Sequence, residues 1–189
     1  MASDWIFLRH GECQGNVARL LVAPDDVPLT AVGWSQARAA GDVLAAMNVV
    51  RIVSSPALRA RQTAAAVLER CPSCRLVVLE ALRERSFGAM NLWTIEQVKA
   101  SAWSSTRIAW QQAAPGGETL ARVANRAIEA LASLDDVGAT LVVTHAGVMR
   151  AVVGLLDGVA RARIGTIQVP HAVPWRRSVP VGGWSGLGD

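Results

Sequence analysis

Two residues that can bind an anion follow a short apolar run near the start of the chain. The apolar residues 5–8 are followed at once by Arg9 and His10, and then by Gly11. In open α/β sheets, ligands bind at the carboxyl ends of strands, so polar side chains directly after a buried strand indicate a binding site. A guanidinium beside an imidazole suits an anion, and phosphate in particular. The sequence therefore predicts an anion site at the end of a first strand.

The same arrangement recurs in the second half of the chain. The apolar residues 141–143 lead through Thr144 to His145, Ala146 and Gly147, where a helix is expected to begin. Two strands that each deliver a histidine to one edge of a sheet predict a pocket with two imidazoles. The free N–H groups at the start of that helix favour an anion in the same space.

Two arginines in the early turns of another predicted helix point to the same kind of ligand. Arg59 and Arg61 stand where a cation opposes the helix dipole, so helix stability alone would favour Asp or Glu there. An arginine in this place makes sense if an anion lies in front of it and is held by guanidinium contacts. Surface arginines are common at such positions, and Arg61 is interpreted as one of them.

The elements that must position these residues alternate between strand and helix along the chain. Such alternation predicts an α/β fold, a three-layer α/β/α sandwich with a mostly parallel central sheet. Thr30 and Ser55 are predicted N-caps, with Pro56 as a first helical residue. The predicted strands are residues 5–9, 49–53, 76–79, 140–144 and 164–169, and the predicted helices are residues 31–47, 56–70, 118–134 and 147–156.

Two stretches of the chain are less regular. Residues 86–117 are predicted to form a cap-like segment over the site. Trp93, Trp103 and Trp110 within it are interpreted as packing residues, and a role in lining a substrate pocket is left open. Residues 178–189 are rich in Gly and Pro and are predicted to be a loosely held C-terminal tail.

The composition is that of an ordinary globular protein, with 51% apolar and 18% charged residues. No internal repeat or linker divides it, so residues 1–189 are predicted to form one domain. No apolar run approaches the ~20 residues of a membrane span and no signal peptide is recognised, so a cytoplasmic protein that binds no membrane is expected. The net charge of +4 comes from scattered arginines rather than a basic stripe, so nucleic acid is not an expected partner.

An odd number of cysteines, at positions 13, 71 and 74, argues against a disulfide framework and agrees with a reducing compartment. Cys71 and Cys74 have C-x-x-C spacing, but they follow a helical stretch, whereas a thioredoxin-type pair opens one. No two further ligands are spaced to complete a zinc site, so neither a metal nor another cofactor is expected. The pair is interpreted as a plain turn.

Six short motifs together resemble the histidine phosphatase superfamily, also called the phosphoglycerate mutase-like fold. They occur in the family's order, and their combination is far more specific than any one of them. They read Arg-His-Gly-Glu at residues 9–12, Leu-Thr-x-x-Gly-x-x-Gln-Ala at 29–37, Ser-Ser-Pro followed by Arg-Ala-x-Gln-Thr-Ala within 54–64, Leu-x-Glu followed by Phe-Gly within 82–88, Gly-Gly-Glu-Thr at 116–119 and Thr-His-Ala-Gly at 144–147.

The resemblance implies a catalytic role for five residues. His10 would be the nucleophile that becomes phosphorylated on a ring nitrogen, and Glu84 would donate a proton to the leaving group. Arg9, Arg59 and His145 would hold the phosphoryl oxygens. The chemistry agrees, because guanidiniums beside an imidazole lower its pKa and so favour the unprotonated, nucleophilic form. Phosphoryl transfer needs mainly positioning and charge neutralisation, which this cationic cluster supplies without a metal.

Three further residues are candidates for binding phosphate or substrate. The resemblance implies such contacts for Asn16 and for Ala146, and it places Glu118 near the phosphate pocket. A carboxylate favoured by the dipole of the helix that it starts is the alternative interpretation of Glu118. Glu84 lies between two arginines, and an exposed charged loop is the alternative interpretation of that run.

The resemblance implies a metal-independent phosphatase of the histidine acid type, acting on a small phosphomonoester like the broad-specificity or α-ribazole-phosphate enzymes. The short segment 86–117 gives water access to a phosphoenzyme, which favours a phosphatase over a cofactor-dependent phosphoglycerate mutase. A catalytically silent binding or regulatory member of the fold is a third alternative. The expected partner is a small phosphorylated metabolite. The substrate, a homodimer and the redox sensitivity of Cys13 are left open.

Overall fold

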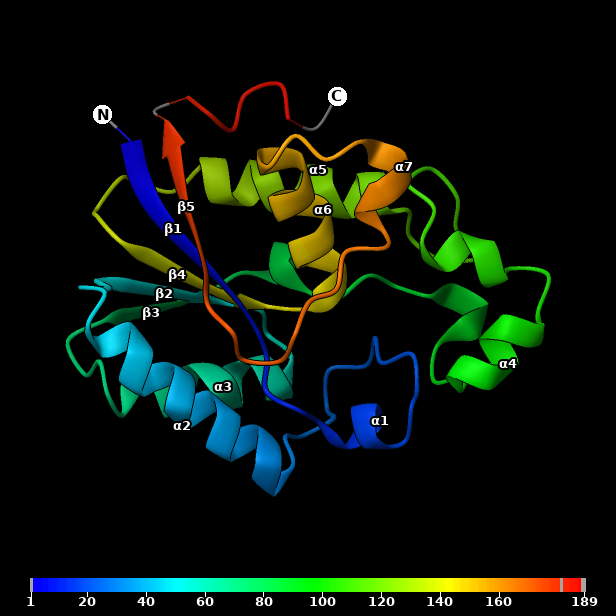
Figure 1. Cartoon of the computed structure of the whole chain (residues 1–189), viewed down its shortest axis with the longest axis horizontal. Helices are drawn as coiled ribbons and strands as arrows, with labels where there is room; N and C mark the ends of the chain where they lie inside the picture. The colour runs from blue at the N-terminus through cyan, green and yellow to red at the C-terminus, as the bar shows by residue number, and fades with distance from the viewer. Residues whose placement is uncertain (1, 181, 188–189) are drawn as a thin grey trace.

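The computed structural model describes residues 2–180 and 182–187, and strands alternate with helices along them (Figure 1). The strands are β1 (Ala2–Arg9), β2 (Arg51–Ser54), β3 (Arg75–Val78), β4 (Thr140–Thr144) and β5 (Trp175–Pro180). The α-helices are α1 (Gln14–Val17), α2 (Ala31–Ala45), α3 (Leu58–Leu68), α4 (Ile95–Ala100), α5 (Leu120–Ala132), α6 (Ala146–Leu156) and α7 (Arg161–Ile164). Short 3₁₀ helices lie at Glu80–Leu82, Gly88–Met90 and Ser104–Arg107.

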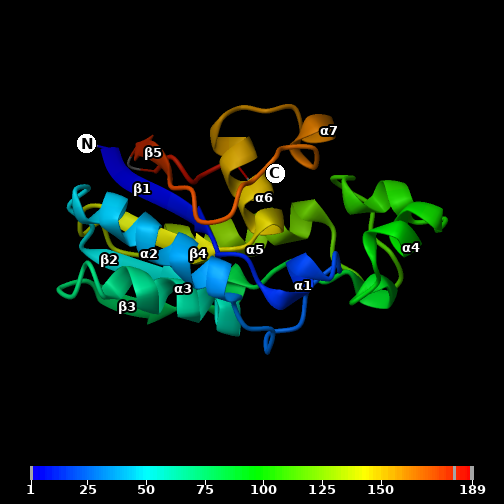
Figure 2. The same cartoon turned by 60° about the horizontal axis from the view of Figure 1, so that its bottom comes forward.

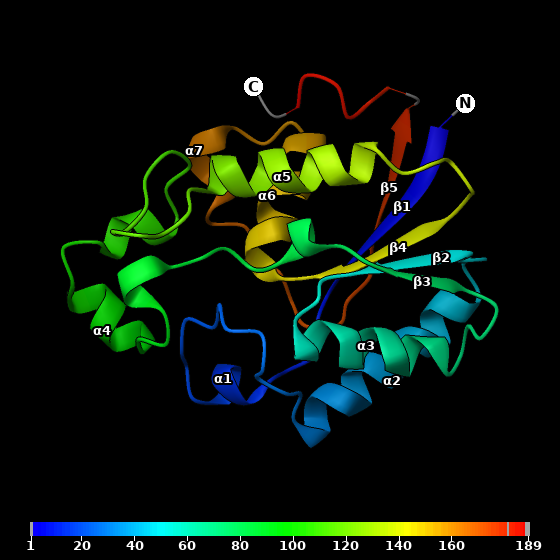
Figure 3. The same cartoon turned by 180° about the vertical axis from the view of Figure 1, so that it is seen from behind.

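The strands form one sheet in the order β3-β2-β4-β1-β5. The first four of these are parallel, whereas β5 runs antiparallel to β1 at the edge. Helices α2 and α3 cover one face of the sheet, and α5 and α6 cover the other, as Figures 2 and 3 show from two further directions. The three-layer α/β/α sandwich with a mostly parallel sheet, predicted from the sequence, is confirmed.

Alternate side chains of β1 enter two separate hydrophobic cores. Ile6 and Leu8 pack under α2 and α3, whereas Phe7 packs on the opposite face with residues of α5 and α6. This alternation follows from the two-residue period of a strand, and burial on both faces explains why the strand reads as a continuous apolar run. Each such side chain contributes about 1.5–3 kcal/mol by its burial. The two strands that end at His10 and His145 are therefore held from both faces of the sheet.

The helix starts agree with the sequence in one case and differ in another. Thr30 is the N-cap of α2 as predicted, and its side chain accepts a hydrogen bond from the N–H of Gly33. The predicted start of the next helix at Ser55 was wrong, because α3 begins at Leu58 with Ala57 as its N-cap. The Ser55 hydroxyl forms a hydrogen bond with the ring of His145, so Ser55 is not the N-cap of α3.

The last strand was also predicted in the wrong place. Residues 164–169 are not a strand: α7 ends at Ile164, and the backbone after it is irregular. The carbonyl groups of Ile167 and Val169 accept hydrogen bonds from arginine side chains rather than from a neighbouring strand. The fifth strand is instead β5, which pairs with β1.

The C-terminal segment is more ordered than its composition indicates. Residues 178–180 belong to β5, so the prediction of a loose tail from residue 178 was wrong for them. Trp184 packs edge-to-face against Trp5 with the ring centroids 5.0 Å apart. This aromatic contact attaches the segment to β1. Residues 181 and 188–189 of the predicted tail lie outside the described residues.

Residues 86–117 extend beyond the carboxyl ends of the strands, where α4 lies in Figures 1 and 3. They have a small core of their own, in which Met90 and Val98 pack with Leu21 from the loop after α1. Trp93 and Trp103 pack against that core, and Trp110 is buried in the main core beneath α5 and α6. The three tryptophans are packing residues, as the sequence analysis interpreted them.

The C-x-x-C stretch is a turn between α3 and β3, as predicted, with both thiols free and buried. The thiol of Cys74 donates to the carbonyl of Val49, which places it against the sheet. Among the described residues, no helix has the length and apolar character needed to cross a membrane.

Candidate active site

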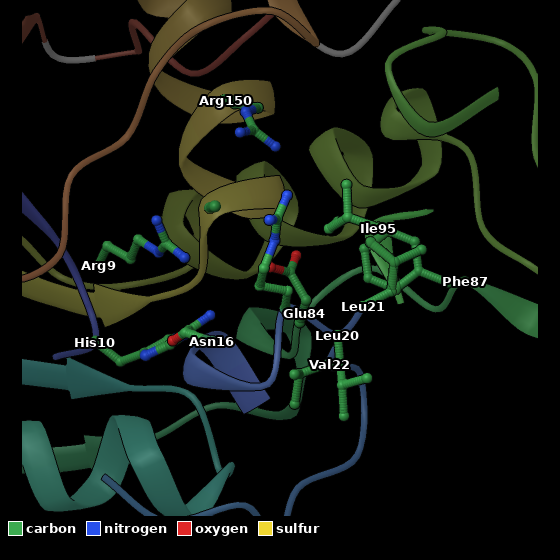
Figure 4. Close-up of a pocket in the computed structure, with 12 residues that line it drawn as sticks. Arg9, His10, Asn16, Leu20, Leu21, Val22, Glu84, Phe87, Ile95 and Arg150 are labelled. Carbon is green, nitrogen blue, oxygen red and sulfur yellow. The ribbon is translucent and has the colours of Figure 1, made fainter. Parts of the chain in front are cut away.

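The pairing of β1 with β4 brings two histidines together. Arg9 and Thr144 are partners in the parallel register, so His10 and His145 leave the sheet side by side. The N–H of His10 donates to the carbonyl of Thr144 at 2.9 Å, and the two imidazole centroids are 5.2 Å apart. The two imidazoles predicted at the sheet edge do lie side by side, but of the two His10 lines the cavity and His145 lies behind it; Figure 4 shows His10 at one side of the cavity.

A close backbone contact fixes the loop that follows β1. A Cβ atom on Gly11 would lie 2.3 Å from the carbonyl oxygen of Gly33, and one on Gly33 would lie 2.0 Å from that of Glu12. Neither position therefore accepts a side chain. The Thr30 hydroxyl also donates to the Glu12 carboxylate at 2.7 Å. The motif at residues 29–37 thus holds the motif at residues 9–12 in place.

The ring of His10 is held in one tautomer. Its Nδ1 lies 2.7 Å from the carbonyl oxygen of Gly11, an acceptor, so Nδ1 carries the proton and Nε2 carries the lone pair. Burial, followed by the charges of Arg59 and Arg9, holds the pKa of His10 well below its usual value. His10 is therefore neutral at neutral pH, with Nε2 available as a nucleophile.

His145 is fully buried beside it, and its partner is a residue that the sequence analysis used only as a helix cap. The hydroxyl of Ser55 lies 2.8 Å from Nε2 of His145 and also accepts from the N–H of Ala57 at 3.3 Å. Among the hydrogen bonds of the described residues, Nε2 is the one acceptor for the Ser55 hydroxyl hydrogen, so the hydroxyl donates to Nε2 and the proton of a neutral ring lies on Nδ1. Burial and the charge of Arg59 lower the pKa of His145 as well.

The two predicted phosphate-binding arginines are both buried, but they differ in what they contact. Arg9 lines the cavity, and one of its outer nitrogens donates to the carbonyl of Val169 at 2.7 Å. Burial lowers the pKa of Arg9 to about 10, so it is still a cation at neutral pH. Arg59 does not line the cavity, and its outer nitrogens donate to the carbonyls of Val22 and Pro24. Arg59 therefore acts on the histidines from behind that loop.

Glu84 lies in the cavity at the start of α6. Its carboxylate accepts hydrogen bonds from the N–H of Gly147 at 3.1 and 3.3 Å and from the N–H of Arg85 at 2.8 Å. A Cβ atom on Gly147 would lie only 2.2 Å from Oε1 of Glu84. The glycine after Ala146 is thus required for this placement of the carboxylate. The alternative of an exposed charged loop does not describe Glu84, which is partly buried and faces the cavity.

Glu118 is placed elsewhere. Its carboxylate forms a bidentate pair with Arg126 at 2.8 and 2.9 Å, and it is not among the residues that line the cavity beside His10. Burial alone would raise the pKa of Glu118, but the hydrogen bonds and charge of Arg126 outweigh it and lower the pKa. Arg126 also donates to the carbonyls of Ala81 and Arg83. The pair therefore ties the start of α5 to the segment that carries Glu84.

The cavity has a volume of about 260 Å³ and two unlike walls. One wall is polar and the other is formed by apolar side chains from the loop after α1 and from residues 86–117 (Figure 4). Among the described residues, no group of three or more His, Cys, Asp or Glu side chains could hold a metal ion. The lining residues are Arg9, His10, Asn16, Arg19, Leu20, Leu21, Val22, Glu84, Phe87, Ile95, Ala146 and Arg150.

Asn16 and Ala146 line the cavity, and their contacts with phosphate or substrate stay a prediction. Cys13 lies just behind the lining. The side-chain oxygen of Asn16 accepts from both the N–H and the thiol of Cys13 at 3.0 Å. The amide nitrogen of Asn16 is consequently the end that can donate to a ligand. Cys13 itself is fully buried.

Two residues near His10 were missed in the sequence. Arg150 lines the cavity, and its spacing of four from Ala146 on a predicted helix could have revealed it, since such residues share a face. His171 donates from Nδ1 to the carbonyl of His10 at 3.0 Å, with the ring centroids 5.6 Å apart. Nothing in the sequence around His171 marks this contact, because it depends on how the chain returns from α7 to β5.

Comparisons with known proteins point to one family. The model of the histidine phosphatase superfamily (branch 1) matches residues 5–175. A 2,3-bisphosphoglycerate-dependent phosphoglycerate mutase of Methylobacterium radiotolerans is 31% identical over 183 residues, which cover 89% of this chain and 86% of the mutase.

Solved structures with the same fold include phosphatases. The native structure of a mycobacterial glucosyl-3-phosphoglycerate phosphatase has a TM-score of 0.84 at 27% identity, and the match covers 97% of this chain and 93% of that one. A candidate alpha-ribazole-5'-P phosphatase from Escherichia coli has a TM-score of 0.82 at 25% identity, with 95% and 91% covered. The similarity to both spans nearly the whole of each chain.

Proposed function

Since the chain belongs to the histidine phosphatase superfamily (branch 1), we propose that it hydrolyses a small phosphomonoester by way of a phosphohistidine at His10. The proposal extends to a metal-independent reaction and to a small phosphorylated metabolite as the partner. The segment 86–117 would act as the cap over the leaving group. The names of the similar structures, which include a glucosyl-3-phosphoglycerate phosphatase and a candidate alpha-ribazole-5'-P phosphatase, support a phosphatase.

One observation carries this proposal. Among the described residues, the buried side-chain nitrogen or oxygen atoms without a hydrogen-bond partner are Nε of Arg9, Nε of Arg59 and Nδ1 of His145. A buried donor without a partner costs about 1–3 kcal/mol, so three of them around one histidine require an explanation. A phosphoryl group supplies three acceptor oxygens and negative charge, which matches donors of this kind. The family resemblance selected the same three residues to hold a phosphoryl group.

The first step forms the phosphoenzyme. Nε2 of His10 attacks phosphorus, and the bond from phosphorus to the leaving oxygen breaks. The positive charge of Arg9 and the Nδ1–H of the neutral His145 stabilise the phosphoryl oxygens. The carboxylic acid of Glu84 gives its proton to the leaving oxygen, so that an alcohol departs instead of an alkoxide. Asn16 and the backbone at Ala146 add contacts to the phosphoryl group. Little covalent chemistry is asked of the protein beyond positioning and charge.

The second step releases phosphate. A water molecule attacks the phosphorus of phosphohistidine and gives its proton to the Glu84 carboxylate, and the bond from phosphorus to Nε2 breaks. The protein returns to its starting state, with the proton back on Glu84. In this scheme the unpartnered Nε of Arg59 is a third donor to the phosphoryl oxygens, and its charge adds to burial in keeping both imidazoles neutral. Glu118 acts indirectly, because with Arg126 it holds the segment that carries Glu84.

A phosphoglycerate mutase is the second candidate, because a mutase is among the relatives with 31% identity. A mutase must return the phosphoryl group to its substrate before water takes it. The two functions differ in one assay: a mutase isomerises 3-phosphoglycerate with stimulation by a bisphosphate, whereas a phosphatase releases inorganic phosphate from it.

Trapping the intermediate tests the proposed chemistry. We expect rapid acid-free quenching during turnover of p-nitrophenyl phosphate to give one acid-labile, base-stable phosphate per chain, located at His10. His10→Ala should abolish both the label and hydrolysis. Glu84→Gln should accumulate the label, because p-nitrophenolate leaves without a proton whereas attack by water lacks its base.

The exposed Arg61, two residues from Arg59, offers a matched control. Arg61→Gln removes one positive charge and should leave the label and the rate within about twofold of the parent protein, as expected for a surface change. Full hydrolysis by His10→Ala, or a label on another residue, would overturn the assignment of His10. A protein that binds phosphomonoesters without hydrolysing any of them would instead be a silent member of the family.

A further inference from the structure

The chain between α7 and β5 contacts the backbone at the end of β1, where the proposed nucleophile lies. We call residues 169–172 the strap. Nδ1 of His171 donates to the carbonyl of His10 at 3.0 Å, and the next N–H, that of Ala172, donates to the carbonyl of Arg9 at 2.9 Å. Because His10 lies one residue beyond the end of β1, its carbonyl is not part of the ladder between strands and takes its donor from the strap. The scheme above gives His171 no task.

The strap keeps this arrangement in spite of backbone strain. Ala172 is buried and has a φ of 51°, in the left-handed region that favours glycine. A residue with a Cβ atom stays in this region only where the surrounding contacts require it, and such positions cluster at functional sites. The strained residue follows directly on His171, so that one side-chain donor and one backbone donor meet two consecutive carbonyls.

The peptide group between His10 and Gly11 is held at both ends. Its carbonyl accepts from His171, and its N–H donates to the hydroxyl of Thr63 at 3.1 Å. That hydroxyl donates in turn to the carbonyl of Arg59 at 2.7 Å, so its position is fixed by α3. The next carbonyl along the chain, that of Gly11, is the acceptor for Nδ1 of His10. The orientation of this one peptide plane therefore sets where the acceptor of the ring proton lies.

We propose that His171 is a positioning residue that keeps the His10 ring in the tautomer able to attack phosphorus, an inference that rests on the proposed function. With the Gly11 carbonyl in place, the ring proton stays on Nδ1 and the lone pair stays on Nε2. If the peptide plane turned, Nδ1 would lose its acceptor and the proton would be free to move to Nε2, which would then have no lone pair for the attack. His171 is not among the residues that line the cavity, so it acts through His10.

Nitrogen NMR of the imidazole rings tests this inference without any substrate. Protonated and unprotonated ring nitrogens give separate signals, and comparison with His10→Asn assigns those of His10. We expect a single tautomer with the proton on Nδ1 in the parent protein and a mixture of both tautomers in His171→Leu, which removes the donor. His171→Asn should restore the single tautomer, because its side-chain Nδ2 takes the place of Nδ1 and also donates.

The same variants should separate the chemical step from phosphate binding. We expect His171→Leu to slow the phosphorylation of His10 by p-nitrophenyl phosphate about 10- to 100-fold, as the loss of an orienting partner does. The inhibition constant of inorganic phosphate should change by less than about threefold, since Arg9 keeps its contact with Val169. A general disturbance of the site would change both quantities. His171→Asn should phosphorylate within about threefold of the parent rate.

A second variant approaches the same peptide from its other end. Thr63→Val removes the acceptor of the Gly11 N–H and should also give a mixture of tautomers, which keeps the test open if His171→Leu does not fold. Val173→Ala, at the exposed residue directly after the strap, is the control and should change neither readout.

The inference and the proposed function fail in different ways. A single Nδ1 tautomer in His171→Leu or, if that variant does not fold, in Thr63→Val overturns the positioning role, and so does a mixture in the parent protein. Hydrolysis by the parent would be unaffected by that result. If the tautomers behave as expected while the parent hydrolyses no phosphomonoester, the positioning role stands and the proposed function fails.

Discussion

The two ends of the cavity are built in different ways. We call the end formed by His10, His145, Arg9 and Arg59 the phosphate end, and the end formed by residues 19–22, residues 86–117 and Arg150 the leaving-group end. At the phosphate end, strand register places the histidines and buried backbone contacts lock the loop. At the leaving-group end, backbone hydrogen bonds join Leu21 to Leu92 and Trp93. The rest of this irregular segment is held by packing among its side chains.

This difference separates chemistry from specificity. Strand pairing and close glycine contacts tolerate little change, so the groups proposed to act on phosphorus are held to one geometry. Loops fastened by side chains accept changes of length and sequence at small cost. A fold of this kind can keep one reaction while its leaving-group end adapts to different substrates.

The largest expected effect concerns the attachment of the leaving-group end. Arg85, only 3% exposed, donates to the carbonyls of Thr106, Arg107, Gln112 and Glu118. Arg85→Met leaves these acceptors without a partner and should lower the free energy of unfolding by about 3–5 kcal/mol. Chemical denaturation measures this, and hydrogen exchange should show amides of residues 95–107 losing protection before those of β4.

Arg83 provides the comparison, since it flanks Glu84 on the other side. It is half-buried, and its partly exposed side chain pairs with Glu80 and Asp25. Arg83→Met should cost about 0–1 kcal/mol, as surface ion pairs do. Equal losses for the two variants would contradict the view that one buried arginine fastens the segment.

The second effect concerns Glu84, where the two ends meet. Gly147→Ala forces the Glu84 carboxylate away from the start of α6, because the new Cβ atom would lie 2.2 Å from Oε1. We expect kcat to fall about 100-fold for alkyl phosphates, the lower range for loss of a general acid. The fall should be smaller for phosphorylation by p-nitrophenyl phosphate, whose leaving group needs no proton.

A glycine in the same helix serves as the control. A Cβ atom on Gly154 would meet only the side-chain ends of Ile164 and Ile167, at 3.0 Å. Gly154→Ala should therefore keep kcat within about threefold of the parent value. A similar loss of activity in both variants would show that α6 as a whole, rather than Glu84, had been disturbed.

The sequence predicted the phosphate end better than the leaving-group end. His10 and His145 follow short apolar strands directly, so local pattern alone places them, and α/β alternation then brings the strands together. Asn16, Glu84 and Ala146 line the cavity as the family motifs implied. Arg59 and Glu118 also belong to the family motifs, but the motifs do not specify what their side chains contact. Arg59 donates to backbone carbonyls, and Glu118 pairs with Arg126.

The parts that could not be predicted depend on long-range contacts. Residues 164–169 have strand-like composition, but their carbonyls accept from Arg9 and Arg150, which lie far away in sequence. Trp184 packs against Trp5, although the two residues are separated by nearly the whole length of the sequence. Helix and strand propensities do not predict such contacts. Where two local structures have nearly equal energy, the tertiary contacts decide which one forms.

The last effect is a pH dependence that comes from the buried histidines at and beside the phosphate end. Burial, with the charges of the nearby arginines, lowers the pKa values of His10 and His145 in the folded protein, whereas in the unfolded chain both titrate near about 6.5. Below that pH the unfolded chain binds more protons than the folded protein does. The free energy of unfolding must therefore fall as the pH falls below about 6.5, with the sign set by the greater proton uptake of the unfolded state.

Thermal unfolding between about pH 7 and about pH 5 measures this fall, because most carboxylates titrate only near pH 4 and lower. The pKa of His171, which contacts His10, is lowered by burial as well. His10→Asn removes one of these three titrations and should make the fall shallower. Asp136→Asn is the matched control, since the pKa of that carboxyl is also lowered in the fold, by a hydrogen bond from Ser3, and its removal should act only at more acidic pH. An unchanged slope in His10→Asn would mean that His10 is protonated as easily in the fold as in the unfolded chain. The neutral nucleophile on which the phosphate end depends would then have to be generated by substrate binding instead of by burial.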